Sequence, residues 1–333
     1  MKDEILYRVQ KNFPLVIKPF EQIAKELNTT EEEVIKILQE EKLNKIIRQT
    51  SAIFDTKRLG YKSSLVAFEI NEDKIDNAVA ILNSHPGISH NYERNHRYNI
   101  WFTIAISPQS KSKLEDIVRL LSKLTKASDY ILLPTLKLFK ISVKLDTTNK
   151  QDKKEKVEKK KFKDLVLTPI HLQIIKEAQN DINIVSEPFK NIIEKLNITY
   201  DEFFSALENF QEAGIMRRFA CILNHRKAGF NANAMVAWDI EEGKEGERIG
   251  AIAASFSAVS HCYLRPKYPT WNYNLFTMIH GKTKEDTQGV IENIQKEISY
   301  KSNIPLYSSR EFKKIRIKYF SDEFKQWEEK YIK

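Results

Sequence analysis

The sequence predicts an α+β protein built as a tandem duplication, in which a winged helix-turn-helix and a ferredoxin-like βαββαβ sandwich domain occur twice. Similar segments lie on both sides of a Lys-rich stretch, such as RQTSAIFDTKRLGYKSSLVAFEI at 48–70 and RRFACILNHRKAGFNANAMVAWDI at 217–240. The repeat spacing of about 170 residues is far longer than a solenoid repeat of about 20–50 residues. We therefore expect a duplicated domain pair.

Each half begins with two short helices joined by a tight turn. In residues 14–27 the apolar positions follow helical spacing, and Thr30 stands three residues before Glu33, which is the capping-box pattern of a second helix. The counterpart is EPFKNIIEKLNITYDEFFSALENFQEAGIMRR at 187–218. Both helix pairs continue into a strand-like segment, and this order predicts a winged helix-turn-helix.

The rest of each half follows the order strand, helix, strand, strand, helix, strand, which predicts a four-stranded antiparallel sheet covered by helices on one face. In the first half the elements are expected at about 64–70, 72–84, 88–94, 97–106, 110–125 and 129–143. In the second half they are expected at about 233–240, 244–256, 258–265, 271–280, 282–298 and 304–319. The predicted divisions are a helical unit at 1–60, a sandwich domain at 61–145, a linker at 146–163, a helical unit at 164–229 and a sandwich domain at 230–333.

The charge of the chain is concentrated in one place. The 333 residues carry a net charge of +9, and the stretch from Lys144 to Lys163 holds nine lysines against four acidic residues. This stretch has almost no apolar residues and predicts a solvated linker, so the basic pI is a weak argument for nucleic-acid binding. The N-terminus lacks the apolar core of a signal peptide, and no apolar run approaches the roughly 20 residues that span a bilayer, so we expect a cytoplasmic protein without a membrane partner.

The second helix of each predicted helix-turn-helix begins with acidic residues. Glu31, Glu32 and Glu33 open the first, and Asp201 and Glu202 open the second. Acidic residues favour a helix N-terminus but repel a polyanion. We therefore expect these units to serve packing or dimerisation rather than DNA binding.

The same three polar residue types recur at alternate positions of one predicted strand in each half. The strands contain His90, Tyr92, Arg94 and, in the second half, His261, Tyr263, Arg265. Alternation places each trio on one face of its strand. Because the trio occurs twice in the same order, we interpret this face as a functional one rather than as a solvated surface.

The segments around these strands differ between the halves. The second half has a longer loop after its strand, PKYPTWNYNLF, whereas the first half continues as NHRYNIWF. A polar cluster precedes a glycine in both halves, but a histidine, His225, occurs in it only in the second half. Arginine and lysine bind carboxylates, aromatic side chains offer flat apolar area, and histidine and tyrosine transfer protons. This combination suits a planar ligand with several carboxylates.

The strand motifs carry a resemblance to a known family. The helix-turn-helix followed by a ferredoxin-like domain resembles the leucine-responsive regulatory protein superfamily, and GISHNYERNHRYNIWF, VSHCYLRPKYPTWNYNLFTMIHG, FACILNHRKAGFNANAMVAW and SSREFKKIRIKYF look like the paired subunits of siroheme decarboxylase. The resemblance spans nearly the whole chain outside the Lys-rich segment, and it implies a head-to-tail fusion of both subunits. Members remove the carboxyl groups of two acetate side chains of siroheme, which gives didecarboxysiroheme for heme synthesis.

The resemblance also implies roles for the candidate residues. His261, His225 and Tyr263 are the candidate proton donors or substrate-positioning groups. A histidine can also ligate the siroheme iron, and the sequence does not separate these roles. No cofactor beyond the iron of the substrate is expected, since the macrocycle itself delocalises negative charge. The candidate substrate-binding residues are Arg265, Arg226, Lys267, Trp271, Tyr273, His90, Tyr92, Arg94, His96 and Arg97.

Two other functions fit the same sequence. A ligand-responsive transcription regulator would bind DNA in a salt-sensitive manner. A non-catalytic tetrapyrrole-binding protein would use the same face without chemistry. The two halves are expected to pair within the chain, and further self-association is left open by the sequence. The two cysteines, Cys221 and Cys262, lack metal-binding or redox spacing and are expected to be buried thiols.

Overall fold

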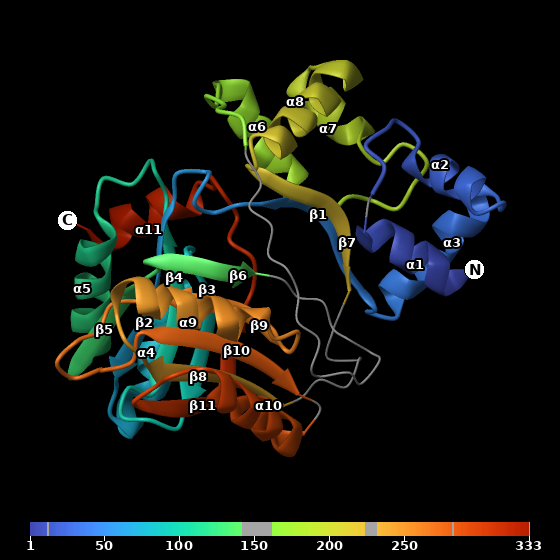
Figure 1. Cartoon of the computed structure of the whole chain (residues 1–333). Coiled ribbons are helices and arrows are strands. Elements are labelled where there is room, and N and C mark those ends of the chain that lie inside the picture. Colours follow the sequence, from blue (N-terminus) through green and yellow to red (C-terminus); the bar gives the residue numbers. More distant parts are fainter. Residues whose placement is uncertain (12, 142–161, 224–231, 282, 333) are drawn as a thin grey trace.

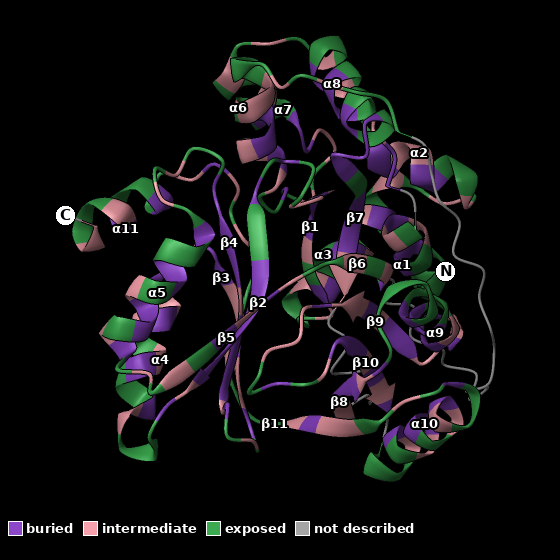
Figure 2. Cartoon of the chain, turned by 60° about the vertical axis from the view of Figure 1, so that its left-hand side comes forward, coloured by how far each residue is buried: buried purple, intermediate pink, exposed green. Residues whose placement is uncertain are grey.

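The nine-stranded sheet at the centre of the molecule forms two layers, one from each half, which face each other and are called the two sheets below; helices cover both outer faces (Figure 2). The structure is a computed structural model that describes residues 1–11, 13–141, 162–223, 232–281 and 283–332. The helical units lie to one side of this sandwich, joined to it by a two-stranded ribbon (Figure 1). The expected α+β duplication, with helix-turn-helix and sandwich domains in both halves, is confirmed.

Each half contributes a set of elements in the expected order. The first half contains α1 (Lys2–Lys11), α2 (Pro19–Glu26), α3 (Glu31–Leu43), β1 (Ile47–Phe54), β2 (Lys62–Glu69), η1 (Glu72–Lys74), α4 (Ile75–Ser84), β3 (Ile88–Arg94), β4 (Ile100–Ile106), α5 (Leu114–Thr125), β5 (Asp129–Pro134) and β6 (Lys137–Ile141). The second half contains α6 (Pro169–Ala178), α7 (Lys190–Leu196), α8 (Tyr200–Glu212), β7 (Met216–Leu223), β8 (Ala232–Asp239), α9 (Gly243–Ser255), β9 (Val259–Leu264), β10 (Leu275–Gly281), α10 (Lys284–Glu297), β11 (Ser302–Lys314) and α11 (Glu323–Tyr331).

The two helical units share one apolar core. Buried residues from α1, α2, α3, α6, α7 and α8 form a single cluster that also includes parts of β1 and β7. The N-cap of α3 is Thr30, whose side chain accepts the N–H of Glu33 at 3.2 Å, as the sequence predicts. The acidic start of α3 also contacts the other unit, because Ser186 donates to Glu31 at 2.9 Å. The units are therefore packed against each other, as expected.

The strand that follows each helix pair joins its counterpart rather than a neighbour in its own unit. β1 and β7 pair antiparallel, with Thr50 opposite Cys221 and Ala52 opposite Phe219. This two-stranded ribbon connects the helical units to the sandwich (Figure 1). The sequence predicted both strands but not this pairing, since periodicity does not identify a strand's partner.

Each half builds the four-stranded antiparallel order of a ferredoxin-like domain. The orders are β5-β2-β4-β3 in the first half and β11-β8-β10-β9 in the second. Strand β4, IWFTIAI, is apolar except for Thr103, because both of its faces are largely buried. Ile100 and Phe102 face the helices, whereas Trp101 faces the other sheet.

The last strand of each half extends across to the other half. In β11, residues 302–307 pair with β8 and residues 308–314 pair with β3. In the first half, β5 pairs with β2, and β6, which follows it closely, pairs with β9. Within the described residues, nine strands thus form one continuous sheet in the order β5-β2-β4-β3-β11-β8-β10-β9-β6. The two halves pair within the chain through main-chain hydrogen bonds.

An apolar layer fills most of the space between the two sheets. It contains Trp101, Leu133, Trp271, Phe276 and Leu306, contributed by both halves. Cys262 packs on the helix side of its sheet and Cys221 in the helical core, and both are buried free thiols, as expected. No helix in the part of the chain that the structure describes is long and apolar enough to cross a membrane.

Candidate active site between the two sheets

A β-bulge places a serine beside a histidine in both halves. The register of β3 against β4 shifts between Ile88 and His90, and the register of β9 shifts at the matching position, next to His261. A bulge re-aims the side chains around it. Ser89 Oγ lies 2.9 Å from Nδ1 of His90, and Ser260 Oγ lies 2.8 Å from Nδ1 of His261.

Both histidines face the interior between the sheets and stack on the next residue of the same face. His90 is paired across the ladder with Thr103, and His261 is paired with Met278. The ring centroids of His90 and Tyr92 are 6.2 Å apart with an interplanar angle of 30°. Those of His261 and Tyr263 are also 6.2 Å apart, at 23°. The expected alternation is therefore present, and the two trios are related by the pseudo-symmetry of the halves.

The two histidines are close enough to influence each other electrostatically. The pKa of His261 is lowered to about 4, mainly by burial and then by the nearby His280, His90 and Arg217. The pKa of His90 is lowered to about 4 by burial, with Lys314 and Arg48 contributing. Both rings are therefore neutral near pH 7 in the empty protein. Among the residues that the structure describes, Nε2 of neither ring has a hydrogen-bond partner.

The third member of each trio is a buried arginine that reaches into the opposite half. Arg94 Nη1 donates to the main-chain oxygen of Leu306 at 2.5 Å, and Arg265 Nη1 donates to that of Leu133. Burial lowers the pKa of each guanidinium to about 10, so both remain charged at neutral pH. Neither makes an ion pair with a described carboxylate, and Nε of both is buried without a partner. The Nε–Nη2 edge is the one that binds a carboxylate in a bidentate manner.

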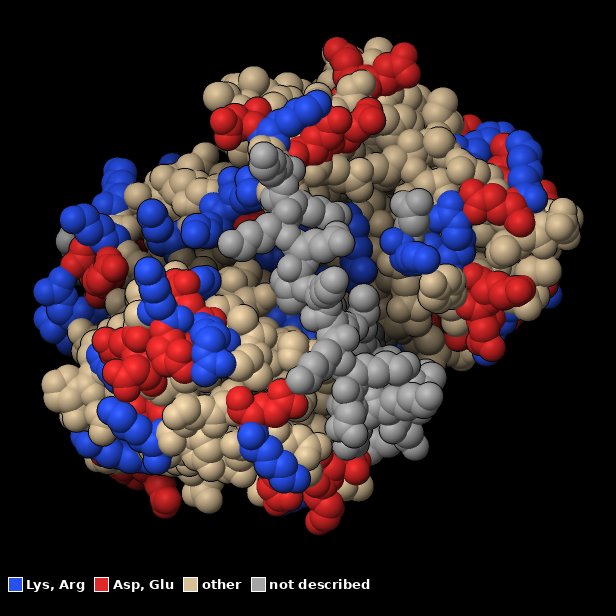
Figure 3. Space-filling model, viewed as in Figure 1, with Lys and Arg blue, Asp and Glu red and all other residues tan. Residues whose placement is uncertain are grey.

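Two arginines of the β1–β7 ribbon extend the site toward the helical units. Arg48 on β1 influences His90, and Arg217 on β7 influences His261 and Tyr263. Arg48 Nη2 donates to the main-chain oxygen of Lys314 at 3.1 Å, and Arg217 forms an ion pair with Asp55 at 2.9 Å. Basic side chains gather along this boundary (Figure 3).

These ribbon arginines were missed by the sequence analysis. They occupy the first position of the matched segments RQTSAIF and RRFACIL, so the duplication itself contained the signal. A third basic residue, Arg316, lies near Arg48 and Arg218, and its pKa is lowered chiefly by the protein atoms that displace water around it. Within the described residues Arg316 makes no hydrogen bond or ion pair, which leaves its guanidinium available to an anion.

Several predicted residues lie near the arginine end of the two trios, away from the two histidines. Lys267 is paired with Asp239 at 2.6 Å. Through Met278, His261 stands level with Met235, so Asp239 lies four residues further along β8, about 13 Å at about 3.3 Å per residue. Trp271 is buried in the layer between the sheets, with its ring centroid 5.3 Å from that of His96. Tyr273 packs on Trp271 at 4.9 Å. Arg97 is exposed and paired with Glu69 at 3.0 Å.

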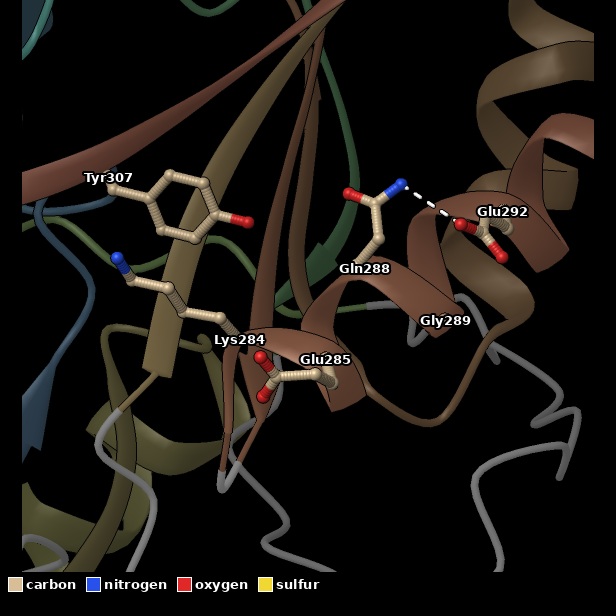
Figure 4. A pocket seen from close by; sticks show the side chains of 6 residues that line it. All are labelled: Lys284, Glu285, Gln288, Gly289, Glu292 and Tyr307. Carbon is tan, nitrogen blue, oxygen red and sulfur yellow. Dashed lines mark hydrogen bonds between the residues drawn. The ribbon is translucent and has the colours of Figure 1, made fainter.

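The remaining candidates, His225 and Arg226, lie outside the described residues. A separate depression on the surface is formed by α10 and Tyr307, where Lys284 Nζ lies 5.8 Å from the tyrosine ring centroid (Figure 4). It contains no residue of the two trios. No group of three or more metal-binding side chains occurs among the residues with described positions. We therefore take the two trios and the ribbon arginines as the candidate site.

Comparison with known proteins places similar sequences over the whole chain. The family model described as AsnC-like ligand binding domain matches residues 58–140 and 227–313. The model described as siroheme decarboxylase NirDL-like HTH domain matches residues 2–48 and 172–217. A siroheme decarboxylase of Hydrogenobacter thermophilus is 39% identical over 98% of this chain and 96% of its own length.

Separate siroheme decarboxylase subunits and solved siroheme decarboxylase structures are also similar to this chain. The siroheme decarboxylase beta subunit of Methanosarcina barkeri is 40% identical over 44% of this chain and 96% of its own length. The crystal structure of the siroheme decarboxylase NirDL matches with a TM-score of 0.80 at 34% identity, covering 99% of this chain and 98% of that chain. A second structure of NirDL, in co-complex with an iron-uroporphyrin III analogue, matches equally well.

Proposed function

We infer the function of this protein from the premise that the chain belongs to the siroheme decarboxylase family. It is a carboxy-lyase that removes CO₂ from two acetate side chains of siroheme and yields didecarboxysiroheme, a step of heme biosynthesis. The iron is part of the substrate, and we propose that the protein uses no cofactor of its own.

We place the macrocycle between the two trios, beneath the β1–β7 ribbon. The observation that carries this assignment is the pair of buried arginines without an acidic partner among the described residues. Burying an unpaired charge is costly, and functional sites are where such a cost is accepted. Since siroheme carries several carboxylates, Arg94 and Arg265 would each bind one through the Nε–Nη2 edge. The hydrogen bonds to the main-chain oxygens of Leu306 and Leu133 fix the orientation of the two guanidinium groups.

The ribbon arginines, together with Arg316, would complete the binding of the anionic substrate. Arg48, Arg217 and Arg316 would hold the carboxylates that project toward the helical units. The positive charge of Arg48 also opposes protonation of His90, and that of Arg217 opposes protonation of His261. Bound carboxylates reverse this effect, because a nearby negative charge raises the pKa of an imidazole. Substrate binding therefore supplies the condition under which a histidine carries a proton.

The chemistry needs one bond cleavage and one proton for each acetate. The bond between the methylene carbon and the carboxylate breaks, CO₂ leaves, and the electron pair is delocalised into the macrocycle. A proton from Nε2 of His261 or His90 then reaches the methylene carbon and forms the methyl group. Tyr263 and Tyr92 flank the two rings and would align the macrocycle. We retain His225 and Arg226 as candidate substrate contacts.

Anaerobic incubation of the purified protein with siroheme tests this function. We expect mass analysis to show loss of two CO₂ per macrocycle. Binding of siroheme without loss of mass would indicate a carrier, and tight, salt-sensitive DNA binding without loss of mass would indicate a regulator. Replacement of His261, His90 and His225 by alanine, one at a time, then assigns the proton donor.

A further inference from the structure

A second histidine stands behind His261 in a continuous line of hydrogen-bonding atoms. Ser260 Oγ lies 2.8 Å from Nδ1 of His261 and 2.7 Å from Nε2 of His280. Nδ1 of His280 lies 2.7 Å from Oδ1 of Asn233. These residues come from three adjacent strands, β9, β10 and β8. The line runs from the start of β8 to the imidazole that faces the interior.

The first half has no histidine at the equivalent place. Asn99 and Asn274 mark corresponding positions, since each side-chain oxygen accepts a main-chain N–H, from Ile70 and Ile240 respectively. Counting six residues onward from each gives Ala105 in the first half and His280 in the second. Ser89 instead lies 2.8 Å from the hydroxyl of Thr103. The two trios are alike, but only the second has an imidazole behind its serine.

The direction of the hydrogen bonds follows from the chemistry of each atom. Oδ1 of Asn233 accepts, so Nδ1 of His280 carries a proton. When His280 is neutral, its Nε2 accepts from the Ser260 hydroxyl. Ser260 Oγ then accepts from Nδ1 of His261, and Nε2 of His261 is left without a proton. In this state His261 cannot donate to the substrate.

A second proton on His280 reverses the donor and acceptor roles in this line of hydrogen bonds. Nε2–H of His280 then donates to Ser260 Oγ, the Ser260 hydroxyl donates to Nδ1 of His261, and Nε2 of His261 carries the proton that faces the interior. The carbonyl oxygen of Met278, 3.3 Å from Ser260 Oγ, is a longer alternative acceptor. The protonation state of His280 thus selects which nitrogen of His261 is protonated.

We propose that His280 supplies the proton that His261 delivers, through Ser260, which makes His280 and Ser260 positioning residues of the second half. This proposal rests on the decarboxylase function above. After CO₂ leaves, Nε2–H of His261 transfers to the methylene carbon, the Ser260 proton moves to Nδ1 of His261, and the Nε2 proton of His280 moves to Ser260. One proton leaves the line, one methyl group forms, and His280 ends neutral. Solvent then reprotonates His280, which is half-buried rather than enclosed.

Single-turnover decarboxylation by the full chain tests the proposal. His280→Ala, which installs the residue found in the first half, is expected to lower the rate at least tenfold with KM within about twofold, because general acid–base groups contribute about 10²–10⁴-fold. Added imidazole is expected to restore part of this rate. His280→Gln can still bond Ser260 but cannot pass a proton, so it is expected to stay slow. His171→Ala, at the N-terminus of α6, serves as the control with unchanged rate.

The outcomes separate the relay from the function itself. If the wild-type protein does not decarboxylate siroheme, the proposed function fails. If the wild type is active and both His280 variants match its rate, the relay is wrong. A slow His280→Ala variant beside a fully active His280→Gln variant also overturns the relay, since it would show that only the hydrogen bond matters. Melting temperatures of the variants identify any loss of rate that comes from unfolding.

Discussion

Arg94 in the first half is joined to Leu306 in the second by a hydrogen bond of 2.5 Å from Nη1 to the main-chain oxygen. Arg265 makes the reciprocal contact with Leu133. Each carboxylate-binding candidate is therefore positioned by the half to which it does not belong. The proposed site would thus depend on the pairing of the two halves, and this relationship leads to the first prediction.

Arg265→Met is expected to weaken siroheme binding strongly while changing the stability of the empty protein little. The variant loses the bond to Leu133, but it also removes the cost of burying an unpaired charge, so we expect a change within about 1 kcal/mol in the free energy of unfolding. A lost charge-assisted hydrogen bond lowers affinity by about tenfold or more. Melting curves with and without siroheme measure both effects, and Arg94→Met is the matched variant. A large loss of stability with unchanged affinity would show that the arginines serve only to join the halves.

His261→Ala is expected to lower the single-turnover rate by about 10²–10⁴-fold, the usual contribution of a general acid. His90→Ala is expected to lower it as well, because both imidazoles face the same interior space. The measurement is the mass of the tetrapyrrole after rapid acid quench, with circular dichroism as the control for folding. Wild-type rates in both variants would exclude the strand histidines as proton donors.

The ribbon arginines are expected to act on binding rather than on chemistry. Arg48→Gln and Arg217→Gln should each raise KM for siroheme about tenfold, since hydrogen bonds to charged groups contribute about 1.5–3 kcal/mol. Their kcat should change little. Arg248→Gln is the control, because Arg248 is paired with Glu245 at 2.6 Å on α9, outside the site. Equal KM values for all three variants would contradict the assignment.

Acid should destabilise the protein through His85, which ends α4. Its Nδ1 accepts the N–H of Gly87 at 3.0 Å, and burial together with Lys313 lowers its pKa from 6.5 to about 3. Because the folded pKa lies below the unfolded one, the unfolded chain binds more protons between these values. The contribution of neutral His85 to the free energy of unfolding is therefore fully present above about pH 6.5 and is lost as the pH drops toward 3.

The loss can be followed through a neighbouring tryptophan. The ring centroid of Trp327 lies 4.3 Å from that of His85, so the share of the fluorescence that comes from Trp327, one of four tryptophans, reports the contact between α11 and α4. Melting temperatures measured at pH 5 and pH 7 should differ less in His85→Phe than in the wild type, since Phe256 stands at the corresponding end of α9. An unchanged difference would mean that other groups, such as His90 and His261, account for the acid sensitivity.

Much of the fold was predictable because its causes are local. Helical spacing, a threonine cap and strand alternation identified most elements, and the duplication placed His90 and His261 at matching positions. The pairing of β3 with β11 was not predictable, since alternation gives the face of a strand but not its neighbour. The same limit applies to Lys267 and Trp271, which the sequence predicts as substrate-binding residues. They follow Arg265 closely in sequence, and the structure places them near that arginine rather than beside His261.

The relay histidine shows a different limit. His280 lies in β10, and only the register of β10 against β9, together with the bulge at Ser260, brings it to Ser260. Neither feature is visible in composition or spacing. The ribbon arginines could have been found from the repeat, because Arg48 and Arg217 begin matched segments.

The exchange of final strands between the halves, β6 and β11, has a consequence for how the two halves can evolve. Two identical subunits joined in this way would have to carry every substitution twice, so an imidazole gained on one side would also appear on the other. A chain with two separately encoded halves escapes that constraint. One copy can keep Ala105 while the other acquires His280, and β6 and β11 still bind the halves together. Fusion of the two halves in one chain thus allows the two copies of one ancestral domain to acquire different roles.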